Sequence, residues 1–449
     1  MESSSRRSFI KKTTAATAAV SFAGILPAMS AKSYGRIIGS NDRIAISVMG
    51  VNSRGKALAS NFAQQKDCDV IHICDVDSRA IEACQKELQT SQDIKTKGFR
   101  DFRESLQDQD IDAMIIAAPD HWHAPAALLA MQAGKHVYLE KPSSHNPHEG
   151  ALLIEAAKKY DKAVQLGNQR RSFPNVIQGM QELLDGVIGR AYFGKGWYAN
   201  NRGSIGTGNE SAVPDWLDWD LWQGPAPRRA YKDNLVHYNW HWFWHWGTDE
   251  ALNNGTHMID MLRWGLDVDY PVKVCSNGGR YRFQDDWETP DTQVISIDFK
   301  EGVSMTWEGR SCNGKSIEGS GAGVIFYGEK GSMLFPGGNN YTVFDLQNNI
   351  VKEVKVEQKL DTGDLVNPFN NLDAIHINNF FDGIRQGSNR LNADIESGHK
   401  STLLVQLGNI AQRVGHSLEI NPETGHILDD DEANTYWSRS YEEGWDMKL

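Results

Sequence analysis

The chain has 449 residues, which is enough for about two or three domains with buried cores. Apolar residues make up 40% and charged residues 23%, and this ordinary composition excludes disordered, collagen-like and coiled-coil proteins. Acidic residues outnumber basic ones by 58 to 46, so we expect no nucleic-acid partner. The five cysteines form no CxxC pair, and we predict no metal site.

Residues 1–31 are typical of an export signal. Arg6 and Arg7 precede an apolar stretch of small residues, and Ala28-Met29-Ser30 offers a cleavage site. The arginine pair followed by Phe9 resembles a twin-arginine signal, which predicts use of the twin-arginine export machinery and a periplasmic or otherwise exported location. A chance arginine pair is the alternative. No later apolar run has the length of a membrane span, so we expect no such span.

The next segment has the pattern of a dinucleotide-binding domain. A β-branched run over 43–48 leads into a glycine turn and an amphipathic stretch, and a second apolar run, 70–74, follows. In this order the glycines permit a tight turn and close helix packing, and the helix amides face a pyrophosphate. The turn reads GxNxxG, which alone is a weak signal because plain turns share it. The cofactor-binding residues that we assign to it are Gly50, Asn52, Ser53, Arg54 and Gly55.

Asp75, directly after the second run, indicates which cofactor this domain takes. It lies 25 residues after Gly50, close to the spacing of a carboxylate that binds the ribose hydroxyls. A carboxylate at this place repels a 2′-phosphate. We therefore expect NAD as the cofactor and NADP less, although Arg79 is near in the sequence.

Apolar runs and helical patterns continue to alternate as far as residue 167. Strands are expected over 111–118, 136–139 and 164–166, and a helix from Pro125 to Ala133. This alternation predicts a doubly wound parallel sheet over residues 40–167, with ligands at the carboxyl ends of its strands. The residues near those ends that we assign to cofactor binding are Pro119, His123, Glu140, Lys141 and Asn168.

With the Glu140-Lys141-Pro142 motif, the chain resembles the Gfo/Idh/MocA oxidoreductases, and the resemblance extends over about residues 40–440. The resemblance implies that the Rossmann domain is followed, over 168–449, by an α+β domain with a large, mostly antiparallel open sheet. It also implies hydride transfer between a nicotinamide and a sugar or polyol carbon, and a homo-oligomer formed through that sheet. The motifs that match, in chain order, are the turn 50–55, the loop 118–123, residues 140–142, residues 167–170 and residues 255–260.

The resemblance also implies catalytic roles. Lys141 would bind the reacting hydroxyl, and His257 would act as the acid/base. Many family members carry Asp four residues before that His, where this chain has Asn253, so the role of this catalytic position is open. Asn253, His257 and Asp260 share one face of the helix expected over 249–265. Without the family, a single His in such a helix is more often a core residue.

The segment 237–246 combines histidines with tryptophans. His237, His241 and His245 recur every four residues, which on a helix would be a conceivable metal site. Four tryptophans occupy every second position from 240 to 246, which favours a strand or an irregular loop. Such aromatic rings suit a wall that binds the faces of a sugar, with plain core packing as the alternative. The predicted substrate-binding residues are Arg170, His241, Trp244, His245 and Asp260.

These patterns lead to one function and two alternatives. We expect an exported NAD-dependent oxidoreductase that transfers hydride between a secondary hydroxyl of a sugar or glycoside and a tightly bound cofactor. An NAD-dependent glycosidase, which oxidises a ring carbon transiently and eliminates the aglycone, is the alternative within the family. A sugar-binding protein without turnover is the third, and the presence of both Lys141 and His257 argues against it. Neutral Asn253 leaves His257 a free base, which favours net oxidation.

Overall fold

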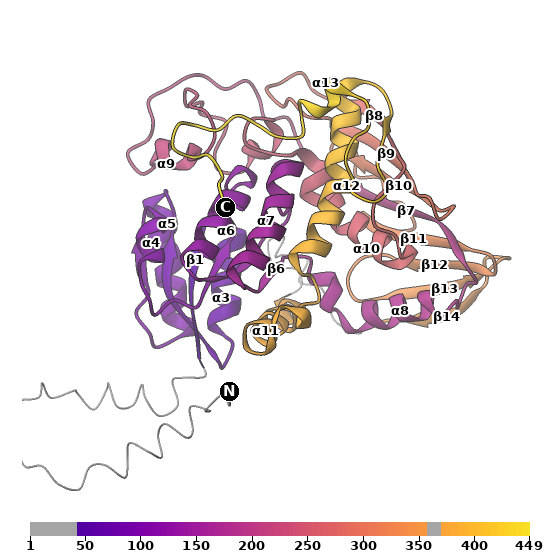
Figure 1. The fold of residues 1–449 in the computed structure, drawn as a ribbon, viewed down its shortest axis with the longest axis horizontal. Helices are drawn as coiled ribbons and strands as arrows, with labels where there is room; N and C mark the ends of the chain where they lie inside the picture. Colours follow the sequence, from indigo (N-terminus) through magenta and orange to yellow (C-terminus); the bar gives the residue numbers. More distant parts are fainter. Residues whose placement is uncertain (1–42, 357–369) are drawn as a thin grey trace, which may run out of the picture. The chain divides into compact units, whose positions relative to one another are not determined.

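The protein is described here from a computed structural model, in which residues 43–356 and 370–449 are described (Figure 1). The predicted export signal, residues 1–31, lies outside the described residues. The described chain forms one sheet of six strands and one of nine, with helices packed on both. None of its helices is both long enough and apolar enough to cross a membrane.

The first sheet is doubly wound and parallel, as predicted. Its strands lie in the order β3-β2-β1-β4-β5-β6, and every neighbouring pair is parallel. Two buried clusters cover its two faces, which explains why its strands are apolar throughout. The strand order reverses between β1 and β4, where such sheets bind their ligands. The strands are β1 (Ile44–Met49), β2 (Cys68–Cys74), β3 (Lys97–Phe99), β4 (Ala113–Ile116), β5 (His136–Leu139) and β6 (Val164–Leu166), and the helices are α3 (Arg54–Ala63), α4 (Ser78–Ser91), α5 (Phe102–Leu106), α6 (Asp120–Gln132) and α7 (Pro147–Tyr160).

The second sheet is large and mostly antiparallel, as the family resemblance implied. Its order is β14-β13-β12-β11-β7-β10-β9-β8-β15, and among its described neighbours only β7 and β10 run parallel. Its strands are β7 (Ala191–Ala199), β8 (Lys273–Gly279), β9 (Thr292–Asp298), β10 (Ser304–Arg310), β11 (Ala322–Gly328), β12 (Gly331–Phe335), β13 (Tyr341–Asp345), β14 (Ile350–Val354) and β15 (Leu418–Glu419).

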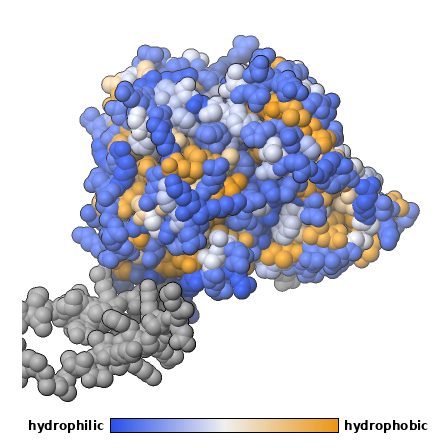
Figure 2. All heavy atoms as spheres, in the orientation of Figure 1, coloured by the Kyte–Doolittle hydropathy of each residue, from blue (hydrophilic) through white to orange (hydrophobic). Residues whose placement is uncertain are grey.

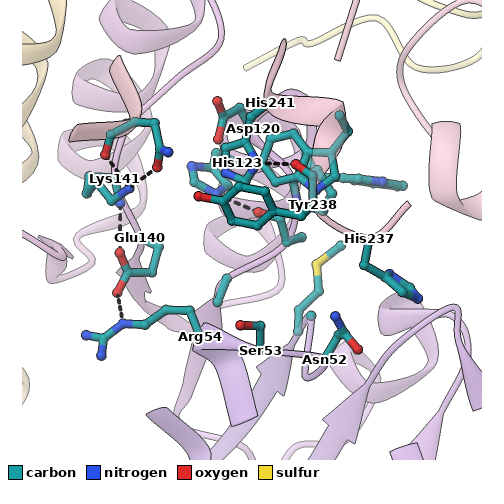
Figure 3. Close-up of a pocket in the computed structure, with 18 of the residues that line it drawn as sticks. Asn52, Ser53, Arg54, Asp120, His123, Glu140, Lys141, His237, Tyr238 and His241 are labelled. Carbon is teal, nitrogen blue, oxygen red and sulfur yellow. Dashed lines mark hydrogen bonds and ion pairs between the residues drawn. The ribbon is translucent and has the colours of Figure 1, made fainter. Parts of the chain in front are cut away.

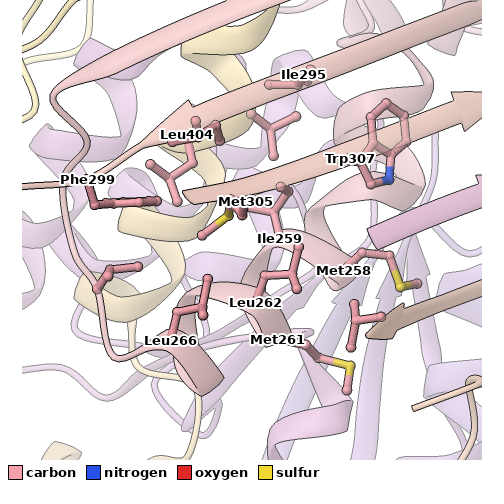
Figure 4. Packing of buried hydrophobic residues seen from close by; sticks show 14 of the residues in the cluster. Met258, Ile259, Met261, Leu262, Leu266, Ile295, Phe299, Met305, Trp307 and Leu404 are labelled. Atoms are coloured by element: carbon pink, nitrogen blue, oxygen red, sulfur yellow. The ribbon is translucent and has the colours of Figure 1, made fainter. Parts of the chain in front are cut away.

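Helix α10 (Thr256–Leu266) packs closely against this second sheet. A Cβ at Gly194 of β7 would lie 2.7 Å from Cδ2 of Leu262, so only a glycine lets the helix approach this far. Leu262 and Met258 share one buried cluster with Trp307 of β10 (Figure 4). This packing fixes the helix that carries the predicted catalytic histidine.

Late parts of the chain return to the first sheet. Phe380 and Phe381 join the buried cluster around Phe62, whose ring centroid lies 5.9 Å from that of Phe381. The core of the first sheet therefore includes residues from the part of the chain that the sequence assigned to the second domain. The remaining helices are η2 (Gln169–Ser172), α8 (Pro174–Leu184), α9 (Trp219–Gln223), η3 (Asn239–Trp242), η4 (Ala251–Gly255), α11 (Asn370–Gln386), η5 (Ser388–Arg390), α12 (Ile395–Val414) and α13 (Asp431–Asn434).

Helix α6 begins earlier than predicted. The expected loop 119–123 forms its first turn, so the helix starts at Asp120 rather than at Pro125. Pro125 has no N–H to donate to the carbonyl of His121, and the Arg439 guanidinium donates to that carbonyl instead, at 2.7 Å. A contact from the far end of the chain therefore stabilises a helix that the proline alone would interrupt.

The aromatic segment forms no strand. Residues 239–242 are the 3-10 helix η3, so the alternation in the sequence does not put histidines and tryptophans on opposite faces. Trp242 is buried and stacks on Trp287, with ring centroids 4.0 Å apart. Trp240 and Trp246 belong to another buried cluster. Core packing therefore accounts for Trp242 and Trp246, whereas Trp240 also lines the cavity described below.

Candidate active site

A cavity of about 640 Å³ lies at the carboxyl ends of β1, β2, β4 and β5 (Figure 3). Residues after β7, residues 237–241, and the start of the η4–α10 helix form its other wall. One cavity thus contains the predicted cofactor turn and the predicted catalytic residues. The sequence-predicted residues that it brings together are Gly50, Asn52, Ser53, Arg54, Asp75, Pro119, His123, Glu140, Lys141, Arg170, His241, Asn253 and His257.

The turn at Gly50 has the geometry of a dinucleotide site. Gly50 has a φ of 83°, and a Cβ there would lie 2.7 Å from the carbonyl oxygen of Ala117. Any other residue would therefore be strained and would collide with the loop after β4. Ser53 is the N-cap of α3 but makes no side-chain hydrogen bond to the helix. Ser53 and Arg54 both line the cavity, so the N-terminus of α3 borders it, where a pyrophosphate fits.

Two predicted cofactor residues do not line the cavity. A Cβ at Gly55 would lie 1.8 Å from the carbonyl oxygen of Gly50, so only a glycine allows α3 to pack this closely against the turn. Asn168 is buried at the N-terminus of η2, and its two side-chain polar atoms have no partner among the described residues. Neither residue is part of the cavity lining.

Asp75 is buried at the end of β2 and fixes the backbone beside the cavity. Its carboxylate accepts hydrogen bonds from the N–H groups of Val51, at 2.7 Å, and Asp77, at 2.9 Å. Burial raises the pKa of Asp75, and the two hydrogen bonds oppose this rise. Arg79 pairs with Asp77 at 2.8 Å, and its guanidinium lies 3.4 Å from the ring centroid of Trp216. Arg79 does not line the cavity, whereas Arg100 and Asp101, directly after β3, line it together with Asp75.

An ion-pair chain connects the cofactor turn with Lys141. Arg54 Nε donates to Glu140 at 2.9 Å, and its Nη1 donates to Asp373 of α11 at 2.8 Å. Glu140 accepts a hydrogen bond from the backbone N–H of Lys141 at 3.3 Å. Burial opposes ionisation of Glu140, but Arg54 and Lys141 hold its pKa below its ordinary value. The turn, the end of β5 and α11 therefore hold one another in place.

Asn253 holds the ammonium group of Lys141. Lys141 Nζ donates to the backbone oxygen of Asn253 at 2.7 Å and to its Oδ1 at 3.1 Å. Burial lowers the pKa of Lys141, and the charge of Glu140 opposes this shift. Asn253 therefore positions the ammonium group without adding a negative charge to it.

His257 follows in the same helix and lines the same cavity. Its Nδ1 is buried and has no hydrogen-bond partner among the described residues. Burial, together with the positive charges of Arg170 and Lys141, lowers its pKa well below the ordinary value. A neutral imidazole with a free nitrogen is suited to accept a hydroxyl proton.

The helix that carries these two residues opens with the π turn η4. Asp249, just before it, has a φ of 77° and accepts a hydrogen bond from the N–H of Leu252 at 3.0 Å. Burial raises the pKa of Asp249 to about 8, against the opposing hydrogen bond from Leu252. A π turn is wider than an α turn and often occurs at functional sites. Here it sets the direction in which Asn253 and His257 point.

Three predicted substrate residues lie outside the cavity, which corrects their assignment. Asp260 pairs with Arg171 at 2.8 Å and accepts a hydrogen bond from Ser401 at 2.6 Å, so partners within the protein occupy its carboxylate. His245 Nε2 donates to the carbonyl of Pro227 at 2.7 Å. Trp244 lines a second cavity. A strand or an irregular loop was expected for the segment of the last two, and the segment forms turns that direct both side chains away from the cavity.

The wall across from Lys141 contains groups that sequence analysis missed (Figure 3). Arg202 and Tyr238 both line the cavity, with the guanidinium carbon 5.3 Å from the ring centroid. Arg202 pairs at 2.6 Å with buried Glu250, which precedes the π turn. Arg202 is the one basic residue in the polar segment 200–213, and that isolation is the signal that could have identified it.

The three histidines of the aromatic segment contact different partners and do not form one site. His237 Nε2 lies 2.8 Å from a carboxylate oxygen of Asp77, and His241 Nδ1 donates to the carbonyl of Tyr238 at 2.6 Å. Burial lowers the pKa of His241 to about 3, while this hydrogen bond opposes the shift. No cluster of His, Cys, Asp and Glu in the described part of the chain could hold a metal ion. The segment therefore offers a neutral His241 to the cavity.

Comparisons with known proteins agree with this geometry. Residues 44–168 match the family model described as "Oxidoreductase family, NAD-binding Rossmann fold". Residues 188–336 and 346–447 match the one described as "Oxidoreductase family, C-terminal alpha/beta domain". The chain belongs to the Gfo/Idh/MocA oxidoreductase family. Its first domain is therefore the NAD-binding Rossmann domain of that family.

Individual Gfo/Idh/MocA relatives are distant. A "Glycosyl hydrolase family 109 protein" of Saccharopolyspora erythraea is 26% identical over 51% of this chain and 55% of its own length. A "Glycosyl hydrolase family 109 protein 2" of Shewanella sp. (strain ANA-3) is 28% identical over 68% of this chain and 67% of its own length. The chain thus matches between about half and two thirds of these relatives' length.

Two solved structures share the fold of this family member. A levoglucosan dehydrogenase in complex with NADH and levoglucosan has a TM-score of 0.64 at 17% identity, covering 84% of this chain and 99% of its own. The myo-inositol dehydrogenase from Lactobacillus casei, in complex with NAD(H) and myo-inositol, has a TM-score of 0.60 at 18% identity, covering 86% and 100%.

Proposed function

We propose that this Gfo/Idh/MocA protein oxidises a secondary hydroxyl of a sugar or glycoside, with NAD held in the 640 Å³ cavity. One observation carries the proposal. Lys141 Nζ is held by both oxygens of Asn253, and the unpaired Nδ1 of His257 belongs to the same cavity wall. A cation and a neutral base are the two groups that oxidation of an alcohol needs beside the nicotinamide.

Lys141 and His257 have different roles in the oxidation of the alcohol. Lys141 donates a hydrogen bond to the substrate oxygen and stabilises its alkoxide character. His257 accepts the hydroxyl proton as the carbon–oxygen double bond forms. Bound NAD supplies the acceptor for the hydride that leaves the carbinol carbon. The products are the ketone and the reduced cofactor. His257, with its lowered pKa, releases the proton to water.

The residues present fit NAD. The turn at Gly50 and the first turn of α3 would hold the pyrophosphate, and Asp75 would accept hydrogen bonds from the ribose hydroxyls. We propose NAD over NADP because the carboxylate of Asp75 would repel a 2′-phosphate and Arg79 is engaged by Asp77 and Trp216; Arg100, which also lines the cavity, is the remaining cation at this edge.

We also propose that NAD stays bound through many turnovers. The segment 216–241, here called the aromatic strap, crosses the edge of the Rossmann domain beside Asp75. The N–H of Ser78 donates to the carbonyl of Trp216 at 3.1 Å, and the N–H of Asp218 donates to that of Val76 at 3.0 Å. A strap tied down on this edge would have to detach before the adenosine half of NAD could leave.

A second candidate function is NAD-dependent glycoside hydrolysis. It requires transient oxidation of a ring carbon, removal of the proton on the adjacent carbon, loss of the aglycone, addition of water, and return of the hydride. Tyr238 and His241 lie across the cavity from Lys141 and would provide the additional base and acid (Figure 3). The names of the glycosyl hydrolase family 109 relatives also favour this candidate.

One assay tests the proposed function. Purified protein with its bound NAD is incubated with a panel of sugars and glycosides, and keto-sugar, free monosaccharide and cofactor absorbance are measured in the same samples. Keto-sugar formed together with reduced cofactor supports net oxidation. Free monosaccharide without net change in the cofactor supports hydrolysis. No cofactor reduction and no product from any compound would contradict both.

We further propose export through the twin-arginine route, from Arg6 and Arg7 in the segment outside the described residues. Replacing both arginines by lysine should retain the protein in the cytoplasm of the producing cell. Fractionation of cells that express either version measures this, and equal export of both would contradict the proposal.

A further inference from the structure

A second cavity, of about 190 Å³, shares no lining residue with the active-site cavity. It lies between the N-terminus of α7, helix α12 and residues 436–439. Since a water molecule takes about 30 Å³, the space would hold roughly six waters. It therefore suits a small ligand and not a second dinucleotide.

Several buried polar atoms of this cavity lack partners. Gln406 is 3% exposed, and its amide Nε2 donates to the carbonyl of Ser144 at 3.1 Å, which leaves its Oε1 unpaired among the described residues. Arg439 Nε pairs with Glu149 at 2.7 Å, but its buried Nη1 has no described partner. His145 Nε2 is also buried and has no described hydrogen-bond partner. Because unpaired buried polar groups are costly, the presence of three of them on residues that line one cavity indicates that a ligand completes them.

The charge of the cavity favours an anion. Arg413 lies on it, with the guanidinium carbon 4.8 Å from the ring centroid of Trp244 and 3.9 Å from that of Tyr436. No ion pair joins Arg413 to a described carboxylate, and none of the described lining residues is acidic. The N-terminus of α7 also borders the cavity, but Glu149 in its first turn accepts from the N–H of His145 and pairs with Arg439, so Arg413 is the unpaired charge of the described lining.

We propose that this second cavity binds a small oxyanion that carries a hydroxyl group, such as protonated phosphate or a sugar acid. The charge of Arg413 and the free N–H of Arg439 select the anion. The unpaired Oε1 of Gln406 accepts a hydrogen bond, so it selects a ligand with an O–H donor over sulfate or chloride. This proposal is independent of the proposed function, because none of these residues lines the active-site cavity.

The test uses the full chain with NAD bound, so that phosphate does not report on an empty cofactor site. Thermal unfolding and calorimetric titration are followed with sodium phosphate, sodium gluconate, sodium sulfate and sodium chloride at one ionic strength. We expect a saturable rise in Tm with phosphate, gluconate or both, and little with sulfate or chloride. Comparison of the phosphate titration with the gluconate titration shows whether the cavity prefers inorganic phosphate or a sugar acid.

Substitutions assign the effect to the second cavity. Arg413→Met removes the cation, and Gln406→Glu is isosteric but replaces the acceptor by a charge that repels the anion. Each should weaken binding by about tenfold or more. Arg282→Met is the matched control, since Arg282 also lies over an aromatic ring, 4.9 Å from the centroid of Phe283, but outside the cavity.

Two outcomes would overturn the proposal. The first is an equal response to all four salts, which would mean that the cavity holds water alone. The second is binding that both Arg413→Met and Gln406→Glu leave unchanged. If Arg413→Met fails to fold, the isosteric Gln406→Glu decides by itself. Loss of binding in Gln406→Glu with binding retained in Arg282→Met supports the site, whichever sugar the active site oxidises.

Discussion

Lys141 and His257 line one cavity, but their neighbours prepare them for opposite roles. Burial lowers the pKa of both side chains. The carboxylate of Glu140 opposes this shift at Lys141, whereas the charges of Arg170 and Lys141 add to it at His257. Lys141 therefore acts as the hydrogen-bond donor, and His257 acts as the proton acceptor.

Removing either group should stop the chemistry without unfolding the protein. General-base removal costs on the order of 10²- to 10⁴-fold, so we expect about that loss in the single-turnover rate of His257→Ala, and at least as much in Lys141→Met. His416→Ala, an exposed histidine paired with Asp430 at 2.7 Å, serves as the control. A wild-type rate in His257→Ala would mean that the base is elsewhere, with His241 or Tyr238 as the next candidates.

Asn253→Asp should move the pH dependence of the reaction. In the wild type the pKa of His257 is well below its ordinary value, so His257 stays neutral and oxidation should persist at mildly acidic pH. A carboxylate at 253 favours the imidazolium and raises that pKa, so the acid limb of the kcat/KM profile should move to higher pH. Asn209→Asp, in an exposed loop, controls for total charge. An unmoved acid limb would contradict the account.

The site residues that sequence could identify depend on contacts close along the chain. The turn at Gly50 forms from adjacent residues, and Lys141 directly follows its strand. Arg202 and Tyr238 reach the cavity only through tertiary packing, with Glu250 as the partner of Arg202. The isolation of Arg202 in its polar segment was the one local signal, and nothing local in the sequence indicates that Tyr238 joins it at the cavity.

Among the elements, the aromatic strap has the clearest testable effect. His237 of the strap contacts Asp77 at 2.8 Å, next to the edge where Asp75 lies. His237→Phe should loosen the strap, so purified protein should contain less nicotinamide nucleotide and rebind NAD more weakly. The nucleotide released on denaturation is quantified against His148→Phe, an exposed histidine of α7. Wild-type NAD content in His237→Phe would contradict a retaining role for the strap.

Elements governed by local periodicity were predicted well, and those governed by distant contacts were not. The predicted strands 136–139 and 164–166 coincide with β5 and β6, because buried parallel strands are short apolar runs. Helix α6 was placed too late because the contact of Arg439 with the carbonyl of His121 lies beyond any local window. Asp260 was assigned to the substrate because its partners, Arg171 and Ser401, are distant in the sequence.

At the scale of the whole molecule, the nine-stranded sheet has a second apolar face. Neighbouring residues alternate: Phe326 belongs to the core under α10, whereas Ile325 belongs to a cluster on the other face with Trp197 and Leu334. The described members of that cluster come from strands and loops, not helices. Apolar patches interrupt the hydrophilic surface on the side of β11 to β14 (Figure 2).

We propose that this second face joins copies of the chain into a homo-oligomer. Tyr327 and Phe193 stack there with ring centroids 5.7 Å apart. The double substitution Phe193→Asp with Tyr327→Asp should yield monomers in light scattering, because it introduces two charges into an apolar contact. Tyr281→Asp, at a residue that is 71% exposed, should leave the mass unchanged. A monomeric wild type, or an unchanged mass in the double variant, would contradict the proposal.

The central claim, net oxidation of a glycoside by retained NAD, is tested most directly by incubation with a disaccharide in deuterated water. Oxidation through Lys141 and His257 removes hydrogen only from the carbinol carbon and its oxygen. The account therefore predicts an intact keto-disaccharide without ring deuterium, formed in step with reduced cofactor. Free monosaccharide with one deuterium beside the oxidised carbon, and no net change in the cofactor, would contradict it and establish hydrolysis by elimination.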